Sequence, residues 1–348
     1  MQQLLAHKRR SVIFTTIIII LLLSLSACSR QDETEKLHPW DDVLFDDIGP
    51  PLELTKETPH GYLSVEHIAF INDNLVGRVF FSYREKEAAI WLVEMLLAMG
   101  YTWEDIQIQE FVRKEINSDW ISRQGARPRY ISQNVILTVS GQSERTIIVA
   151  AHYDTLISNP GASDNASGMA LLLESAQRMH YLDNYYTVVY IFFGAEEIGI
   201  VGSQYYVDGL REHERDNILF MVNADSLFEG SYLFYAVGYN EHRSDANAIV
   251  SIWGNIAFAL YDQYAIELLE HPDGISDTRS DHKPFYFVDI PVIMLTGLHR
   301  YEDGGFWVRA NHTDQDCLHI INEDNPGKVD KAMSAYSLFL EEILLHRY

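Results

Sequence analysis

Four apolar runs between residues 146 and 295 constrain the fold more than any other feature of this chain. They are TIIVAA (146–151), TVVYIFF (187–193), NILFMVN (217–223) and IPVIML (290–295). Runs without alternating polar residues are typical of strands buried on both faces. NVILTV (134–139) reads as a further strand, and helical spacing marks 84–99, 168–179, 245–269 and 328–345. The pattern predicts one α/β domain over residues 61–348, with a largely parallel sheet covered by helices on both faces.

Acidic and histidine residues follow these runs. They are His152, Asp154, Asp164, Glu196, Glu197, Asp225 and His312. In parallel sheets ligands bind outside the carboxyl ends of the strands, so we expect these side chains to meet at one edge. Taken singly, each has an ordinary structural interpretation, such as a helix cap for Asp164. Their joint occurrence after successive strands indicates a site.

The residue types indicate a divalent metal. Histidine and carboxylate ligands without cysteine suit zinc, manganese or cobalt. His152 and Asp154 point the same way in an extended backbone, so Asp154 can accept a hydrogen bond from the ring nitrogen that does not bind metal. Asp164 lies in the small-residue loop GASDNASG (161–168) and could bridge two ions. Two cations about 3.5–4 Å apart would relieve the repulsion among the clustered carboxylates.

Five ordered motifs and a late histidine resemble peptidase family M28, the co-catalytic zinc aminopeptidases. They are HYD (152–154), GASDNASG, FFGAEEIG with the following VGS (192–203), NADS (223–226), SDHKPF (280–285) and His312. The resemblance runs from about Arg84 to the C-terminus. It implies a mixed, mainly parallel central sheet flanked by helices on both faces.

The same resemblance implies roles for individual residues. His152 and Asp225 would bind one zinc ion. Glu197 and His312 would bind a second, with Asp164 bridging both. Glu196 would be the general base toward a metal-activated water. Asp154, placed by its spacing from His152 rather than by the resemblance, is expected to orient that histidine.

Other residues near these motifs have less definite roles. Asp281 and His282 are predicted either to contact substrate or to cap a loop. Tyr301, Phe306 and Trp307 either line a specificity pocket or pack in the interior. His271, His299 and His319 lack motif support and are expected to be structural.

Three functions are compatible with these motifs. The first is an aminopeptidase that hydrolyses N-terminal residues of peptides, and the second is a glutaminyl cyclase that acts on N-terminal glutamine. The third is a non-catalytic surface-binding module, which the intact ligand set and Glu196 argue against. The net charge of −24 argues against a nucleic-acid partner, because phosphates would be repelled.

The N-terminus indicates export. The basic segment 7–10 precedes an apolar run, 11–25, and LSAC (25–28) resembles a bacterial lipobox. Residues 1–27 are therefore predicted to be a lipoprotein signal peptide, with Cys28 lipidated and the protein anchored to a membrane of the cell envelope. An ordinary signal peptide or an anchor helix is the alternative. Ser29, in place of aspartate, favours the outer membrane, and residues 28–60 are expected to form an acidic tether.

Overall fold

The computed structural model describes residues 49, 53–113, 130–157, 159–240, 243–272, 274–275, 280–300, 306–307 and 311–348. The predicted signal peptide, Cys28 and most of the predicted tether lie outside these ranges. Residues Asp47–Tyr348 form one unit. Within it, Leu54 is buried, and the carbonyl groups of Thr58 and Pro59 accept hydrogen bonds from Arg178. No helix in the described ranges has the length and apolar character needed to cross a membrane.

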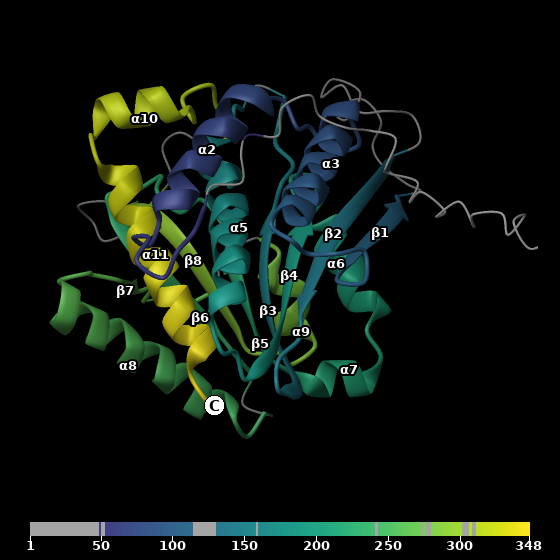
Figure 1. Cartoon of the computed structure of the whole chain (residues 1–348), viewed down its shortest axis with the longest axis vertical. Coiled ribbons are helices and arrows are strands. Elements are labelled where there is room, and N and C mark those ends of the chain that lie inside the picture. The colour runs from purple at the N-terminus through teal and green to yellow at the C-terminus, as the bar shows by residue number, and fades with distance from the viewer. Residues whose placement is uncertain are drawn as a thin grey trace, which may run out of the picture. The chain divides into compact units, whose positions relative to one another are not determined.

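A single mixed sheet forms the centre of the domain (Figure 1). Its strands are β1 (Ile106–Val112), β2 (Ile131–Val139), β3 (Ser143–His152), β4 (Tyr186–Phe193), β5 (Ile218–Ala224), β6 (Tyr232–Gly238), β7 (Leu269–Glu270), β8 (Val292–Arg300) and β9 (Phe306–Trp307). The order is β1-β2-β4-β3-β5-β8-β6-β7, with β9 paired to β8. The central strands β4, β3, β5 and β8 are parallel, while β2 and β6 join them antiparallel. The predicted fold class is confirmed.

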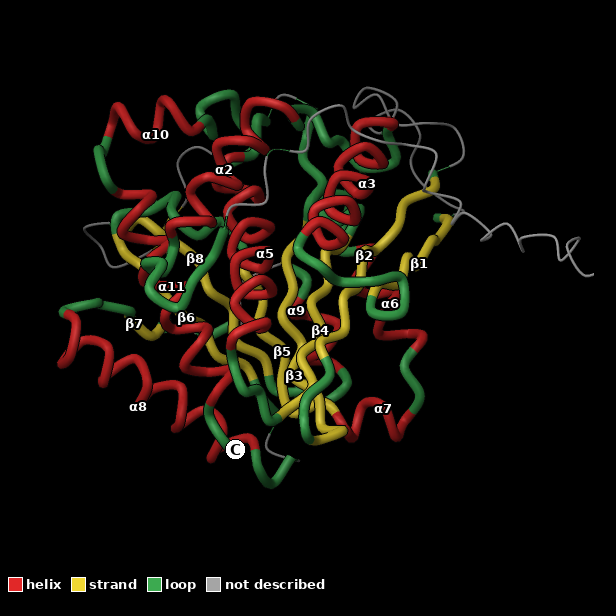
Figure 2. Tube along the Cα trace, in the orientation of Figure 1, coloured by secondary structure: helices red, strands yellow, loops and turns green. Residues whose placement is uncertain are grey.

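Helices cover both faces of this sheet (Figures 1 and 2). They are α2 (Tyr62–Asn74), α3 (Tyr83–Ala98), α5 (Gly168–Arg178), α6 (Val201–Gly209), α7 (Glu212–Asn217), α8 (Ala246–Tyr264), α9 (His282–Phe287), α10 (Leu318–Asp324) and α11 (Lys328–Leu345), with short helical turns η1 (Ala162–Ser167) and η2 (Met179–Tyr181). On one face α5 packs against β3, β4 and β5, and α2 and α11 pack on α5. Against the other face lie α6, α7 and α9.

Successive strands are added first on one side of β3 and then on the other, so the strand order reverses at β3. From β3 the chain passes through α5 to β4 on one side, and from β4 it returns through α6 and α7 to β5 on the other side. A crevice at the carboxyl ends of the strands opens at such a reversal, and ligands bind there in open α/β sheets. The topology therefore places the expected site beside the ends of β3, β4 and β5.

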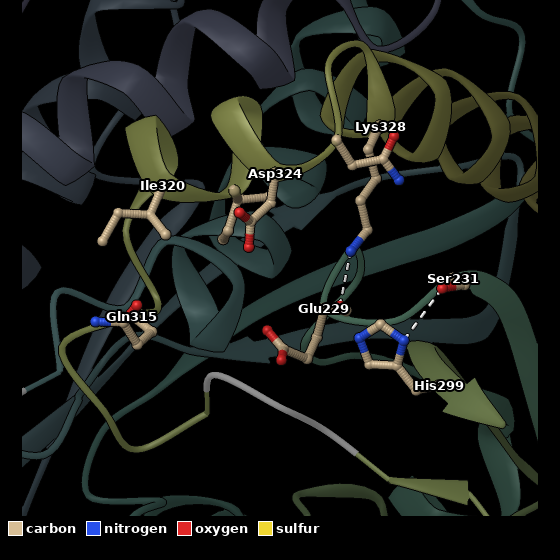
Figure 3. Close-up of a pocket in the computed structure, with 9 residues that line it drawn as sticks. Glu229, Ser231, His299, Gln315, Ile320, Asp324 and Lys328 are labelled. Carbon is tan, nitrogen blue, oxygen red and sulfur yellow. Dashed lines mark hydrogen bonds between the residues drawn. The ribbon is translucent and has the colours of Figure 1, made fainter. Parts of the chain in front are cut away.

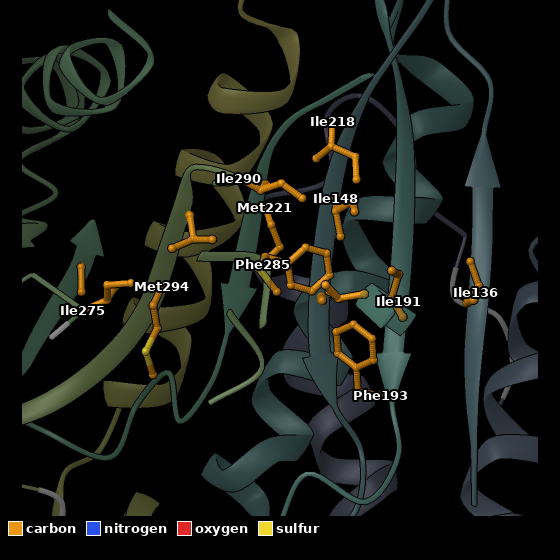
Figure 4. Packing of buried hydrophobic residues seen from close by; sticks show 14 residues of the cluster. Ile136, Ile148, Ile191, Phe193, Ile218, Met221, Ile275, Phe285, Ile290 and Met294 are labelled. Carbon is orange, nitrogen blue, oxygen red and sulfur yellow. The ribbon is translucent and has the colours of Figure 1, made fainter. Parts of the chain in front are cut away.

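Alternate residues of the central strands build the core below this site. Ile148 and Ala150 of β3, Ile191 and Phe193 of β4 and Met221 of β5 belong to one buried cluster, and Phe285 of α9 packs into it (Figure 4). Side chains two positions apart share a face of a strand, so His152 extends the row of Ile148 and Ala150 toward the strand end. Burial of this cluster fixes the strand ends from which the polar residues project.

Candidate metal centre

The carboxyl ends of three parallel strands bring the predicted site residues together. His152 is the last residue of β3 and pairs with Phe193, after which β4 leads into Glu196 and Glu197. Asp225 directly follows β5. These residues meet Asp164 and His312 at a cavity of about 690 Å³. The apolar lining of that cavity includes Ile200, Met294 and Leu298.

The histidines and carboxylates form two groups that share Asp164. Nε2 of His152 lies 3.1 Å from Oδ1 of Asp164 and 3.6 Å from Oδ1 of Asp225. Nε2 of His312 lies 3.4 Å from Oδ2 of Asp164 and 3.0 Å from Oε2 of Glu197. Within each group the candidate ligand atoms lie within 4.8 Å of one another. Each oxygen of Asp164 thus faces a different group, which is the arrangement of a bridging carboxylate.

The charges of this cluster fit bound cations. Burial, and secondly the Asp164 carboxylate, raise the pKa of Glu197 to about 7. Hydrogen bonds to Asp164 and Glu197 raise the pKa of His312 to about 11. Oε1 of Glu197 is buried and has no hydrogen-bond partner among the described residues. A buried ionised carboxylate costs several kcal/mol when it is uncompensated, so the donor set suits divalent cations.

Asp154 contributes in a different way from the one expected. Its carboxylate oxygen lies 3.8 Å from Nδ1 of His152, beyond hydrogen-bond distance. Instead, Nδ1 can donate to the backbone carbonyl of Asp154 at 3.2 Å, which leaves Nε2 free as a ligand atom. The Asp154 carboxylate accepts hydrogen bonds from the backbone N–H groups of Glu196 at 2.9 Å and Glu197 at 3.1 Å. This buried acid therefore fixes the loop that carries both glutamates.

Two residues that the sequence did not single out hold the loop of Asp164. Oxygens of the buried Asp316 carboxylate accept hydrogen bonds from the backbone N–H groups of Ser163 at 2.6 Å and Asp164 at 3.0 Å. The buried Arg78 donates to the carbonyl groups of Tyr153 and Gly161. Burial lowers the pKa of Arg78 to about 10, so the side chain remains charged at neutral pH. Neither residue lies in a recognisable motif.

The SDHKPF segment acts on the site mainly through Ser280. Its hydroxyl donates to Oδ2 of Asp225 at 2.6 Å and accepts from Nδ2 of Asn223 at 2.8 Å. Asp281 and His282 are buried beside it. Burial raises the pKa of Asp281 to about 7, and lowers that of His282 to about 3. Of this segment, Lys283 lines the cavity.

Backbone conformation is unusual where the site residues leave the strands. Ala195, Ser226 and His312 have φ angles of 56°, 56° and 65°, in the left-handed region that favours glycine. Such residues cluster at functional sites, where the surrounding structure holds them in place. Ala195 precedes Glu196 and Ser226 follows Asp225, so the backbone turns sharply at both positions.

The three histidines without motif support, His271, His299 and His319, lie outside both metal groups. Nδ1 of His299 lies 3.1 Å from the hydroxyl of Ser231 in a separate cavity of about 220 Å³, where Lys328 donates to the carbonyl group of Glu229 (Figure 3). His271 packs edge-on against Phe234. Nδ1 of His319 lies 2.9 Å from Sγ of Cys317. Tyr301 and the side chains of Phe306 and Trp307 lie outside the described part.

Comparison with known proteins agrees with this geometry. The profile of peptidase family M28 matches residues 134–337. Aminopeptidase YwaD of Bacillus subtilis is 44% identical over 68 residues, which are 20% of this chain and 15% of that protein. Probable lipoprotein aminopeptidase LpqL of Mycobacterium tuberculosis is 36% identical over 98 residues, which are 28% of this chain and 20% of that protein. The matches thus span a fifth or less of both relatives.

Solved structures show the same fold at low sequence identity. A zinc aminopeptidase of Bacillus subtilis, BSAP, superposes with a TM-score of 0.64 and 16% identity, covering 83% of this chain and 96% of that chain. Glutaminyl cyclase of Fimbriiglobus ruber superposes with a TM-score of 0.62 and 15% identity, covering 85% and 98%. The fold is therefore common to both activities, and the site has to distinguish them.

Proposed function

The chain belongs to peptidase family M28, and on this premise we propose that it is a zinc-dependent exopeptidase that removes N-terminal residues from peptides. The observation that carries the proposal is the pair of ligand groups sharing Asp164. His152 and Asp225 would hold one zinc ion, and Glu197 and His312 the other. Two zinc ions there would polarise the scissile carbonyl group and lower the pKa of water toward ~7.

Glu196 is proposed to carry the proton. It lines the cavity but belongs to neither ligand group, so its carboxylate stays available. The pKa of Glu196 lies well above the usual carboxyl range, mainly because the group is buried. The nearby His152 lowers this pKa and Asp281 raises it further. A raised pKa suits a group that accepts a proton from water and returns it to the leaving amine near neutral pH. The Asp154 carboxylate keeps the backbone of Glu196 in place for this transfer.

The acidic lining also supports action at a free N-terminus. Carboxylates at the cavity can accept hydrogen bonds from an α-ammonium group, which an internal peptide bond lacks. The apolar side chains of Met294 and Leu298 lie in the same cavity and can bury part of the terminal residue. Both features favour release of single N-terminal residues.

The proposal is tested with protein purified without chelator. Zinc content is measured together with hydrolysis of a panel of aminoacyl-p-nitroanilides and dipeptides. We expect bound zinc and release of free amino acid, with activity lost on chelation and restored by zinc. Peptides with an acetylated N-terminus serve as the control and should not be cleaved. Protein that contains zinc but cleaves no member of the panel would contradict the proposal.

Cyclisation of N-terminal glutamine is the second candidate, because a glutaminyl cyclase shares the fold. A glutamine-initiated peptide separates the two activities. Release of free glutamine supports the aminopeptidase, whereas release of ammonia with the peptide bond intact supports the cyclase. The presence of two complete ligand groups favours the first outcome.

We propose that Cys28 of the exported protein is lipidated, because LSAC resembles a lipobox and the relative LpqL is a probable lipoprotein. The anchor would place the enzyme at the bacterial cell envelope, with the outer membrane favoured. Radiolabelled palmitate should enter the wild-type protein and not Cys28→Ser. Labelling of the serine variant would contradict it. Separation of the inner and outer membranes then shows which of the two carries the protein.

A further inference from the structure

The described residues that line the cavity at the metal centre include one lysine and no arginine. Lys283, in the first turn of α9, lines this cavity together with Met294, Thr296 and Leu298 of β8. These three β8 residues alternate along the strand and share one face. α9 packs against β8, and Phe285 is buried there in the core. The helix therefore holds the Lys283 backbone firmly beside the apolar part of the cavity.

The described residues leave the charge of Lys283 without a carboxylate partner. The side chain is half-buried, and it forms no ion pair with a carboxylate in the part of the chain that the structure describes. Lysine commonly lays its aliphatic stem along apolar surface and keeps its charge accessible. Lys283 also lines a neighbouring cavity of about 280 Å³, beside Tyr239, Tyr286 and Phe287. It thus lies between two cavities, with space for a ligand next to its charge.

The surrounding charges make this cation selective. Glu196, Glu197, Asp164 and Asp225 line the same cavity, and the whole chain carries a net charge of −24. The proposed zinc ions would offset Asp164, Glu197 and Asp225, whereas Glu196 and the acidic chain as a whole would still repel an anionic group of a substrate. Beside Lys283 it would gain a charge-assisted hydrogen bond instead. Among the described residues that line the cavity, Lys283 is the one lysine or arginine, and it therefore offers one negative charge a position away from the proposed zinc ligands.

We propose that Lys283 binds a carboxylate of the peptide substrate and so gives the enzyme a preference for peptides that carry an anionic group at this position. The inference rests on the proposed exopeptidase function. Two parts of a peptide can supply the carboxylate. One is the side chain of an N-terminal glutamate or aspartate, and the other is the C-terminus of a dipeptide.

Matched substrate pairs distinguish these sources. Glutamyl-p-nitroanilide is compared with glutaminyl-p-nitroanilide, and leucyl-glycine with leucyl-glycinamide. Each pair differs only in the negative charge. We expect wild-type protein to favour the charged member of one pair, and the identity of that pair gives the source. Lys283→Met should reduce this ratio of kcat/KM by roughly tenfold or more, mainly through KM.

Two further variants control the comparison. Lys283→Arg retains the charge and should preserve most of the ratio, whereas a purely structural role would not depend on charge. Lys331→Met removes an exposed lysine of α11, outside the cavity, and should leave the ratio unchanged. Equal ratios in wild type and Lys283→Met for both pairs would overturn the inference while leaving the exopeptidase function intact. If zinc-loaded wild-type protein cleaves none of the four substrates, nor any aminoacyl-anilide, the proposed function itself fails and this inference with it.

Discussion

The carboxylate of Asp154 holds the backbone of Glu196: its Oδ1 accepts a hydrogen bond from the Glu196 N–H at 2.9 Å. The second oxygen serves the next residue, accepting from the Glu197 N–H at 3.1 Å. One buried acid thereby positions the proposed general base and a proposed zinc ligand.

Asp154→Asn should separate this positioning role from folding. An asparagine retains one oxygen, but its NH2 group would face a backbone N–H, so one of the two hydrogen bonds is lost. We expect kcat to fall by roughly 10- to 100-fold, as for other groups that orient a metal site. The measurement is kcat on an aminoacyl-anilide together with a thermal unfolding curve. A variant with wild-type kcat would show that the two hydrogen bonds are dispensable.

Glu196→Gln should retain the metals and lose turnover. Glutamine keeps the shape of the side chain but cannot accept the proton, so kcat should fall by about 10²–10⁴-fold. Zinc content, measured on the same sample, should equal that of wild type. The matched control is Glu104→Gln, at an exposed position away from the cavity, which should behave as wild type. Turnover within a few-fold of wild type would exclude Glu196 as the base.

Glu197→Ala should lower the zinc content instead. It removes a carboxylate that lies 3.0 Å from Nε2 of His312 and leaves the group of His152 and Asp225 intact. We expect about one zinc ion fewer per chain, because metal sites weaken sharply when a ligand is lost. If metal content stays the same in this variant and falls in Glu196→Gln, the two glutamates have exchanged roles.

His67 should make the domain sensitive to acid. It is buried in α2 against Trp91, and burial, opposed by Glu174, lowers its pKa to about 4. In the unfolded chain this histidine binds a proton near pH 6.5. The contribution of neutral His67 to the free energy of unfolding is therefore fully present above pH 6.5 and declines as the pH falls toward 4. Between pH 7 and 5 the loss from this one residue is about 2 kcal/mol.

Replacement of His67 by leucine tests this loss. Urea unfolding at saturating zinc should show a free energy of unfolding that falls less between pH 7 and 5 in His67→Leu than in wild type, by about that amount. His213→Leu alters an exposed histidine on α7 and should follow wild type. Parallel pH profiles for wild type and His67→Leu would contradict the assignment.

The strands of the centre were predictable because they are buried on both faces. TIIVAA became β3 and TVVYIFF became β4, close to the expected bounds. Their order was not predictable. NVILTV and TIIVAA are neighbours around Gly141, yet β4 pairs with both β2 and β3 and lies between them. Pairing between strands depends on contacts across the sheet that no local pattern contains.

The helix α2 could not be predicted from local spacing for a related reason. Its first turn is held by the buried Glu174 carboxylate, which accepts hydrogen bonds from the backbone N–H groups of Gly61 and Ser64. These partners lie more than a hundred positions away in the chain, so local spacing gave no signal. The strand β6 was not among the expected strands either, although its sequence does contain a local signal. YLFYAVG is rich in the aromatic and β-branched residues that strands favour.

The candidate site likewise contains residues that could be predicted from the sequence and residues that could not. Its proposed ligands follow apolar strands and could be named from the sequence. Asp316 supports Asp164 across 152 positions, and Arg78 reaches Gly161 across 83. Ser280 reaches Asp225 in the same manner, although it lies inside a recognised motif. Side chains that orient ligands through space have no fixed spacing, and only the folded chain identifies them.

Anomalous diffraction at the zinc edge tests the central claim most directly. Crystals of protein purified without chelator should give two zinc peaks, one between His152 and Asp225 and one between Glu197 and His312, with Asp164 contacting both. A single peak, or peaks away from Asp164, would contradict the two-metal centre.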